Sequence, residues 1–284
     1  MAAACTLKPG QDAALATIAV RNATANRAAQ HRPYCPPLPK GGLKLNPRFP
    51  LPRPPHGSTV THPGAEPGCA YIVGYADVRK LNGASLVGPG LTNLAIGDRV
   101  VYNLGNGYFE EDSAGQLDYQ ACRTCRIVHA LPPAHATFLG FGFMPVSATM
   151  QLTEIGTINV ISVGTTSALS YNTAWSLMAL RIYNVKVNGH TLTVGPHCQT
   201  VRPVLIKLTG YSNSRPPYSL QGGGPLTGPI TIPPFTGCGV TENLDPLFTG
   251  TVSGPGNYTK LTQGPLCSLI GGLGCPPKIP RPLR

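Results

Sequence analysis

Apolar and polar residues alternate with a period of two in several short stretches after Ala70. In the stretch 146–152, apolar residues at even positions alternate with Ser, Thr and Gln at odd positions, as a half-buried strand requires. The stretches 204–208 and 226–232 repeat the pattern. Pro229 predicts an edge position for the last of them, because proline cannot donate a backbone hydrogen bond. The pattern therefore predicts strands in this part of the chain.

The dipeptide Asn188-Gly189 stands between two strand-like runs and predicts a two-residue type I′ turn, since both residues tolerate a positive φ. Such a turn fixes the register of the hairpin, with one mostly apolar face. The expected opposite pairs are Val187 with His190, Val185 with Leu192, Tyr183 with Val194, Lys186 with Thr191, and Asn184 with Thr193.

The stretch 177–182 is apolar at both odd and even positions, which favours a strand in the middle of a layered structure. Trp175, the one Trp of the chain, is expected in the core. Short strands separated by turn residues are typical of a sandwich or a barrel. We expect a mainly β protein whose residues 70–267 form an antiparallel β-sandwich of Greek-key type. A division into two subdomains near 136–145 stays open.

Both ends of the chain differ from this body. Residues 1–69 are rich in Ala, Pro and basic residues, with a weak helical pattern at 12–29. The stretch 33–67 holds eleven prolines and few large apolar residues, so it predicts an extended, irregular spacer that cannot build a core. Residues 268–284 form a second Pro-rich, basic tail.

Composition and charge narrow the class of protein. The chain has 34 Gly and 31 Pro, which break helices and serve turns, so helical bundles are excluded. The net charge of +11 lies mainly in the ends, because residues 70–267 carry only +2. A nucleic-acid-binding face needs basic residues on a folded surface, so no nucleic acid partner is predicted. No run of 18 apolar residues exists, and no transmembrane segment is expected.

Nine dispersed cysteines favour disulfides over metal binding. Cys198 and Cys238 form one candidate pair and Cys238 and Cys267 form the competing pair; spacing does not choose between them. The odd number leaves at least one thiol free or bonded to another chain. Disulfides form in oxidising compartments, so we expect an exported, extracellular protein, although no leader is visible in this sequence.

Cys122 and Cys125 have the CxxC spacing, and His129 and His135 follow them. These four side chains are weak candidates for a tetrahedral zinc site. The gap from Cys125 to His129 is much shorter than in zinc fingers, and the following Leu-Pro-Pro prevents the helix that a redox CxxC needs. We therefore predict structural or disulfide-bonded cysteines, with no metal and no cofactor.

One acidic cluster could provide paired carboxylates for glycoside hydrolysis or for calcium. It consists of Glu110, Glu111, Asp112 and Asp118. Consecutive acids point in alternating directions on a strand, so a solvated loop is the preferred interpretation. His190 and His197 have no sequence-adjacent nucleophile and acid. Glycosylation sequons occur at Asn22 and Asn257.

Eight stretches carry a resemblance to other proteins. They are ADVRKLNG (76–83), GPGLTNL (88–94), ATFLGFGFMP (136–145), VKVNG (185–189), IPPFTGCG (232–239), NLDPLF (243–248), SGPGNY (253–258) and QGPLC (263–267). With them, residues 74–267 resemble a group of uncharacterised secreted proteins of actinobacteria. The resemblance implies secretion and brings no activity, substrate or catalytic residue. The first 70 residues, the tail after Cys267 and the stretch 122–129 do not share it.

These observations predict an exported, non-enzymatic binding or structural protein of the cell surface or the extracellular space. Its expected partners are an anionic cell-wall polymer, attracted by the basic ends, or another copy of the chain. Two alternatives stay open: a secreted hydrolase that acts on an extracellular polymer, and a subunit of an extracellular assembly.

Overall fold

The computed structural model describes residues 35–122, 124–165, 170–268 and 274–283. It is mainly β, with 55% strand and 4% helix, which confirms the predicted class. The strands are β1 (Thr59–Thr61), β2 (Glu66–Val78), β3 (Gly83–Asn103), β4 (Tyr108–Asp118), β5 (Ala134–Gly140), β6 (Met144–Glu154), β7 (Ile158–Gly164), β8 (Tyr171–Val187), β9 (His190–Leu192), β10 (Gln199–Thr200), β11 (Val204–Tyr211), β12 (Gly224–Ile232), β13 (Phe235–Thr236), β14 (Gly254–Gln263) and β15 (Cys267–Ser268). Two short helices, η1 (Arg79–Leu81) and α2 (Asp245–Thr251), complete the described elements.

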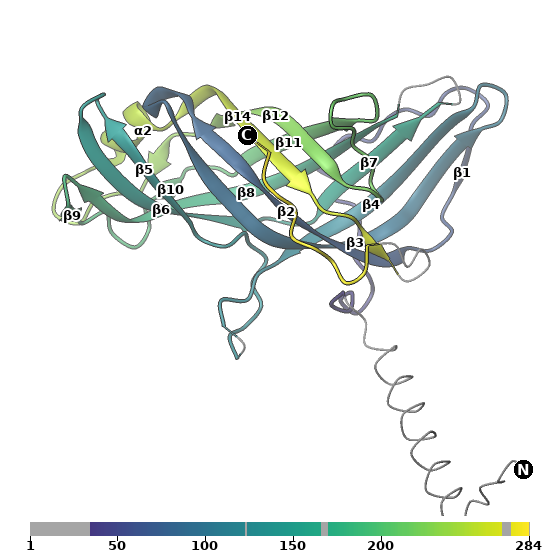
Figure 1. The fold of residues 1–284 in the computed structure, drawn as a ribbon, viewed down its shortest axis with the longest axis horizontal. Helices are drawn as coiled ribbons and strands as arrows, with labels where there is room; N and C mark the ends of the chain where they lie inside the picture. The colour runs from purple at the N-terminus through teal and green to yellow at the C-terminus, as the bar shows by residue number, and fades with distance from the viewer. Residues whose placement is uncertain (1–34, 123, 166–169, 269–273, 284) are drawn as a thin grey trace, which may run out of the picture. The chain divides into compact units, whose positions relative to one another are not determined.

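Eight of the strands form a sheet that closes on itself (Figure 1). Their order is β3-β4-β7-β8-β11-β12-β14-β2, and β2 pairs again with β3 from Glu66↔Ile96 to Val78↔Gly83. All neighbours in this closed sheet are antiparallel, as predicted. The predicted sandwich of two sheets is not confirmed, because the backbone pairings join all described strands into one sheet.

β8 belongs both to the closed sheet and to the strands that extend beyond it. Its first half pairs with β7 and β11 inside the closed sheet, and its second half pairs with β6, β9 and β10. In the stretch 177–182, the even-numbered residues are buried, whereas Leu177 and Ala179 are half-buried and Arg181 is exposed, so only one face of the strand is fully buried. The division considered near 136–145 would fall within the β5–β6 hairpin, whose strands pair from Ala134↔Met150 to Gly140↔Met144.

The Asn-Gly hairpin forms in the predicted register. Val185 lies opposite Leu192 and Val187 opposite His190. Asn188 and Gly189 have φ values of 48° and 82°, as a type I′ turn requires. The outer pairs expected at Tyr183 and Asn184 do not form, because β9 ends at Leu192 and Asn184 itself has a φ of 51°.

The three alternating stretches are strands β6, β11 and β12, as predicted. The edge position expected from Pro229 is wrong, because β12 has β11 on one side and β14 on the other. The register with β11 is confined to Thr209↔Thr227, whereas the pairing with β14 runs past Pro229. The strand therefore accommodates a proline without lying at an edge.

Residues 35–58, named the strap here, contain no strand but pack against the closed sheet. Leu43 and Phe49 of the strap are buried, with exposed fractions of 4% and 5%. The Phe49 ring stacks on Trp175 with 6.0 Å between centroids. The interpretation of this stretch as a spacer outside the core is therefore wrong for its described part. Trp175 itself is half-buried, on the outer face of β8.

Two further links hold the strap. A disulfide joins Cys35 to Cys69 of β2, and β1, which follows the strap, pairs with β3.

The stretch 12–29, with its weak helical pattern, lies outside the described residues. In the part of the chain that the structure describes, no helix is both long and apolar enough to cross a bilayer.

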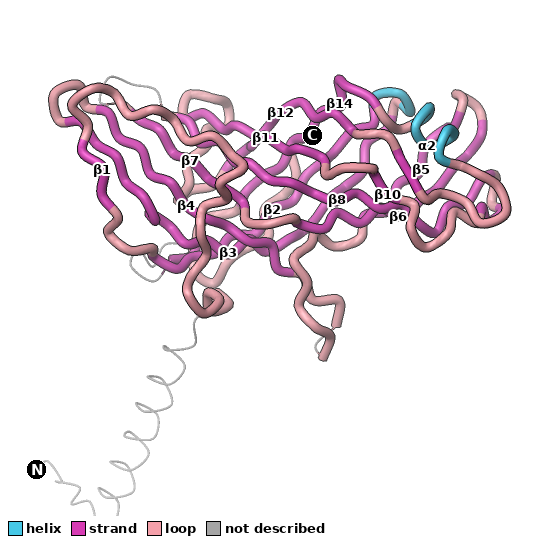
Figure 2. Tube along the Cα trace, turned by 180° about the vertical axis from the view of Figure 1, so that it is seen from behind, coloured by secondary structure: helices cyan, strands magenta, loops and turns pink. Residues whose placement is uncertain are grey.

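The core has two main apolar clusters. One fills the closed sheet and includes Leu94, Met178 and Leu208. The other lies where β5, β6, α2 and the second half of β8 meet, and includes Ile182 and Phe248. Figure 2 shows α2 and β5 at one end of the described unit and β1 at the other.

Candidate functional site

The interior of the closed sheet contains a cavity of about 80 Å³. Its lining follows the period of two predicted from the sequence, because alternate residues of a strand share a face. β8 contributes four such alternate residues, and β3, β7 and β11 contribute two each. These are Asn172, Ala174, Ser176 and Met178; Thr92 and Leu94; Ile158 and Val160; and Ile206 and Leu208.

The strands β2, β4, β12 and β14 complete the wall with mostly apolar side chains, among them Leu117, Leu226 and Leu261. Leu131 reaches the same cavity from the segment between β4 and β5. The backbone N–H of Leu131 donates to the carbonyl of Leu152, which holds this segment against β6. The cavity is thus apolar on most of its surface.

Five polar side chains interrupt the apolar wall, and two of them satisfy each other. Tyr218 donates its hydroxyl hydrogen to Gln263 Oε1 with 2.6 Å between the oxygens. Gln263 Nε2 donates to the carbonyl of Leu220. Burial raises the pKa of the Tyr218 phenol, so this group stays neutral and acts as a donor.

The other polar groups leave hydrogen-bonding capacity at the wall. Ser162 donates to Asn172 Oδ1, and Ser176 donates to Met178 Sδ, which is a weak acceptor. Thr92 Oγ1 is buried and has no hydrogen-bond partner among the described residues. An unpaired buried hydroxyl costs roughly 1–3 kcal/mol, so its place on a cavity wall requires a reason.

Glu154 lies where the pairing of β4 with β7 ends. That pairing stops at Gly115↔Ile158, and Glu154 Oε2 accepts a hydrogen bond from the backbone N–H of Leu117 at 2.6 Å. The pKa of the Glu154 carboxyl is raised to about 8, mainly by burial; the hydrogen bond from Leu117 lowers it and the charge of Asp118 raises it. The carboxyl is therefore mainly protonated near pH 7.

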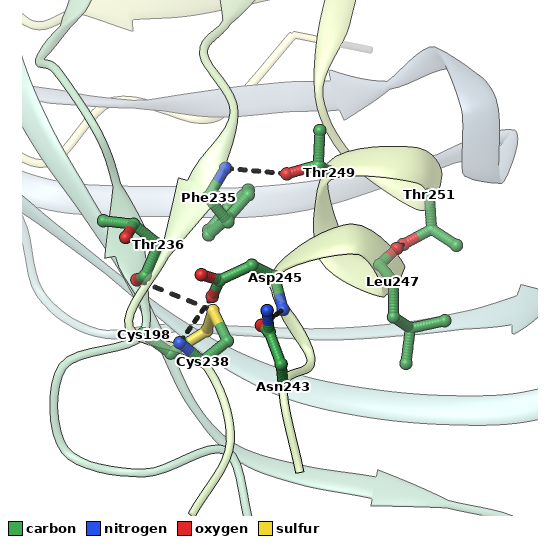
Figure 3. The surroundings of a disulfide bond; sticks show 9 residues. All are labelled: Cys198, Phe235, Thr236, Cys238, Asn243, Asp245, Leu247, Thr249 and Thr251. Carbon is green, nitrogen blue, oxygen red and sulfur yellow. Dashed lines mark hydrogen bonds between the residues drawn. A yellow bond between two sulfur atoms is a disulfide. The ribbon is translucent and has the colours of Figure 1, made fainter.

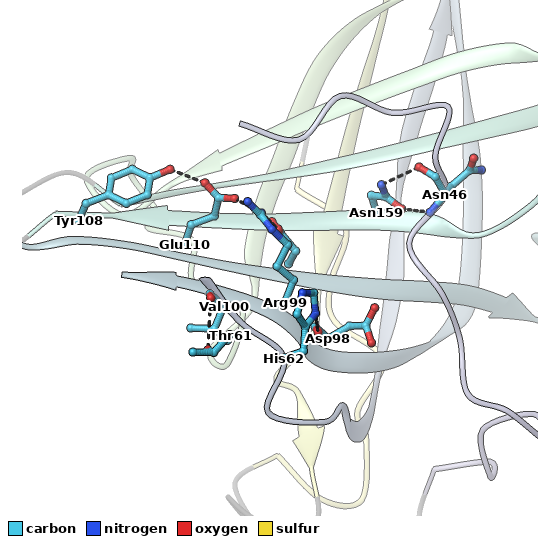
Figure 4. A network of polar contacts seen from close by, with 10 residues as sticks. Asn46, Thr61, His62, Asp98, Arg99, Val100, Tyr108, Glu110 and Asn159 are labelled. Atoms are coloured by element: carbon cyan, nitrogen blue, oxygen red, sulfur yellow. Dashed lines mark hydrogen bonds and ion pairs between the residues drawn. The ribbon is translucent and has the colours of Figure 1, made fainter. Parts of the chain in front are cut away.

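Two members of the acidic cluster, Glu110 and Asp112, are fully buried on the outer face of β4. The preference for a solvated loop is wrong for these two, because both lie in strand β4 and accept hydrogen bonds from Arg99 of β3. Figure 4 shows the Arg99 side chain beside the Glu110 carboxylate. Tyr108 donates its hydroxyl hydrogen to Glu110. Burial raises the pKa of Asp112 to about 6, partly offset by the hydrogen bond from Arg99.

The other two acids lie apart from this network. Glu111 points to the opposite face of β4, and its pKa is raised by burial and by the charge of Glu66. Asp118 accepts hydrogen bonds from Asn93 and from the ring of His129. The four acids of the cluster therefore lie in three different environments. They form no pair of carboxylates that is open to a substrate.

The weak metal candidates are not brought together. Cys122 and Cys125 form a disulfide, and His129 pairs with Asp118 at 3.2 Å. His135 lies beside the hydroxyl of Thr149 on β6. The group in the described part of the chain that has ligand atoms close together is Cys35, Cys69 and Cys267, and all three are in disulfides.

Of the two disulfide pairings left open, the structure has Cys198–Cys238 (Figure 3). Cys267 pairs with Cys275 instead. Next to the Cys198–Cys238 bridge, Asp245 of α2 accepts a hydrogen bond from the backbone N–H of Cys238 at 2.7 Å. All eight cysteines among the described residues are in disulfides, and the ninth, Cys5, lies outside them.

The remaining sequence candidates are separate from the cavity. His190 and His197 are exposed. Asn257 of the second sequon is buried and accepts a hydrogen bond from the backbone N–H of Arg79, so its amide is not open to modification. Asn22 of the first sequon lies outside the described residues.

Sequence reasoning did not identify the cavity residues Thr92, Tyr218 and Gln263. Their signal is weak, because each is a single polar residue near turn residues and their partners are distant in the chain. Comparison with family models, with curated proteins and with solved structures gave no match.

Proposed function

We propose that the protein is an exported, non-enzymatic binding protein that holds a small, largely apolar ligand inside the closed sheet. The observation that carries this proposal is the mostly apolar cavity inside the closed sheet, whose lining includes Thr92 with its unpartnered hydroxyl. Binding sites for small molecules are typically apolar pockets with a few polar groups that fix orientation. The interior of a closed sheet of eight strands is either filled by side chains or holds one small ligand.

Cavity volume and wall chemistry define the ligand class. An engineered cavity of about 150 Å³ binds benzene, so a cavity of about 80 Å³ takes a smaller molecule unless side chains shift. Met178 and Leu131 are flexible enough to turn aside for a longer alkyl chain. The hydroxyls of Thr92 and Ser176 suit one hydroxyl, carbonyl or ether oxygen on the ligand.

The disulfides support the proposed export. Four bridges among the described residues are typical of proteins from oxidising compartments. The association of the basic ends with an anionic cell-wall polymer stays a prediction. The alternative of a hydrolase has less support, because Glu110 and Asp112 have exposed fractions of 0% and both form ion pairs with Arg99.

The test is binding of xenon, an apolar atom smaller than benzene, to the purified full chain, followed by xenon NMR. We expect a saturable change of the xenon signal that is lost in Ala174→Phe, since the larger ring fills the cavity. Ala179→Phe is the matched control, because Ala179 lies on the opposite face of β8. Equal uptake by Ala174→Phe and the parent protein, with both cooperatively folded, would reject the interior as the site. Absence of saturable uptake by the parent protein would reject the proposed function.

A further inference from the structure

The β5–β6 hairpin ends in a strongly apolar turn. Leu139, Phe141 and Phe143, which together are named the tip here, have exposed fractions of 51%, 64% and 77%. The hairpin belongs to the end of the described unit that also holds β9 and α2 (Figure 1). A monomeric soluble surface rarely exposes three large apolar side chains within five residues without a partner.

The chemistry of the hairpin suits an apolar environment. Residues 136–153 contain no Asp, Glu, Lys or Arg, so burial of the tip desolvates no charge. The turn also satisfies its own backbone, because the N–H groups of Gly142 and Phe143 donate to the carbonyls of Leu139 and Gly140. Internal backbone hydrogen bonds are what a segment needs in order to enter hydrocarbon.

Basic side chains flank the hairpin on both sides. The helix η1 contacts β5, and its Arg79 and Lys80 are exposed. On the other side, β6 pairs with the end of β8, where Lys186 is exposed beside the β8–β9 turn. The acid nearest to η1 in sequence, Asp77, accepts a hydrogen bond from the backbone N–H of Tyr258.

An open groove of about 390 Å³, lined by both polar and apolar groups, lies on the surface of the β5–β6 hairpin. Lys186 lines it together with hydroxyl and amide groups from β5, β6, β8 and β9. These groups belong to Thr137, Ser147, Thr149, Asn184 and Thr191. A cation among hydroxyl donors is suited to the phosphate of a lipid headgroup.

From these features we infer that the tip is a docking site for the surface of an anionic lipid bilayer. Phe141 and Phe143 enter the boundary between headgroups and acyl chains, while Arg79, Lys80 and Lys186 lie over the negatively charged headgroups. Charge complementarity favours this occupant, because these cations border an uncharged apolar protrusion. The inference does not depend on whether the closed sheet holds a ligand.

The test is co-sedimentation of the full chain with two kinds of vesicle. One is made of phosphatidylcholine alone, and the other also contains about 30% phosphatidylglycerol. We expect binding to the anionic vesicles and at least about tenfold weaker binding to the neutral ones. The variant Phe141→Asn with Phe143→Ser should reduce binding to anionic vesicles by about tenfold or more. Asn is chosen at position 141 because Phe141 has a φ of 54°, a conformation that Asn tolerates.

Leu104→Ser is the matched control, since Leu104 has an exposed fraction of 91% and follows β3, which pairs with β1 at the other end of the sheet. Its vesicle binding should equal that of the parent protein. Failure of the parent protein to bind anionic vesicles, or an equal loss in Leu104→Ser, would overturn the inference. Self-association in sedimentation velocity that disappears in the tip variant, without vesicle binding, would instead identify a second copy of the chain as the occupant.

Discussion

Asn46 of the strap and Asn159 of β7 exchange two hydrogen bonds. The backbone N–H of Asn46 donates to Asn159 Oδ1 at 2.7 Å, and Asn159 Nδ2 donates to the Asn46 carbonyl at 3.1 Å. Both residues are buried, with exposed fractions of 7% and 0%. The side chain of Asn159 therefore provides the hydrogen-bond partners that the irregular backbone of the strap would otherwise lack.

This exchange makes the strap a measurable contributor to stability. Asn159→Ala leaves a buried N–H and a buried carbonyl without partners, so we expect a loss of about 1–3 kcal/mol in the free energy of unfolding. Urea denaturation of the full chain measures it. Gln221→Ala, at an exposed turn, is the control and should change stability by less than about 0.5 kcal/mol. A loss no larger than that of the control would mean that the strap is not held at this point.

The sequence allowed the local elements to be predicted but not their closure. Asn188-Gly189 carries its turn type and register in two residues, and the prediction of that hairpin is confirmed. The pairing of β2 with β3 also joins near neighbours, whereas β14 meets β2 across most of the chain. An alternation with a period of two predicts which residues of a strand share a face. It does not predict which other strand pairs with that strand.

The surroundings of the acidic cluster and of the strap were harder to predict for the same reason. Glu110 and Asp112 stand with Glu111 in an acidic run that favours exposure. The cation that compensates their burial is Arg99, which precedes them by eleven and thirteen residues. The prediction for the strap was wrong because a proline-rich composition indicates that a segment cannot form regular structure. It does not indicate whether the segment packs against a sheet. The strap has few large apolar residues, but two of them, Leu43 and Phe49, are buried against the closed sheet.

The Arg99 network should be strongly sensitive to loss of its cation. Arg99→Met leaves two buried carboxylates without compensation, so we expect a loss of about 3–5 kcal/mol at pH 7. Part of this loss should be recovered between pH 7 and pH 5, because protonation of the uncompensated carboxylates removes their charge. Urea denaturation at both pH values measures the effect. The exposed Arg202→Met is the control, and a pH-independent loss in Arg99→Met would contradict the argument.

The disulfides should differ in their contributions. In the chain-entropy model, the bridge Cys198–Cys238, with a sequence separation of 40, contributes about 4 kcal/mol. The bridge Cys122–Cys125, with a separation of 3, contributes about 2 kcal/mol. Paired Cys→Ala variants should therefore differ in the free energy of unfolding by about 2 kcal/mol. Equal losses would show that loop length does not determine these contributions.

The buried carboxyl of Glu154 predicts how stability depends on pH. Its pKa in the folded state is about 8, above the ordinary value of 4.5, so between these pH values the folded chain keeps a proton that the unfolded chain has released. The contribution of this group to stability therefore falls as pH rises from about 4.5 to about 8, by at most about 1.4 kcal/mol per pH unit.

Glu154→Gln removes this titration and keeps a side-chain oxygen for the N–H of Leu117. The parent protein should lose stability relative to this variant as pH rises from 5 to 8, as measured by urea denaturation at intervals of one pH unit. The raised pKa of Asp112 acts in both proteins and cancels in the difference. The exposed Glu242→Gln is the control and should follow the parent profile. Parallel profiles for Glu154→Gln and the parent protein would mean that the Glu154 carboxyl is ionised in the folded chain across this range.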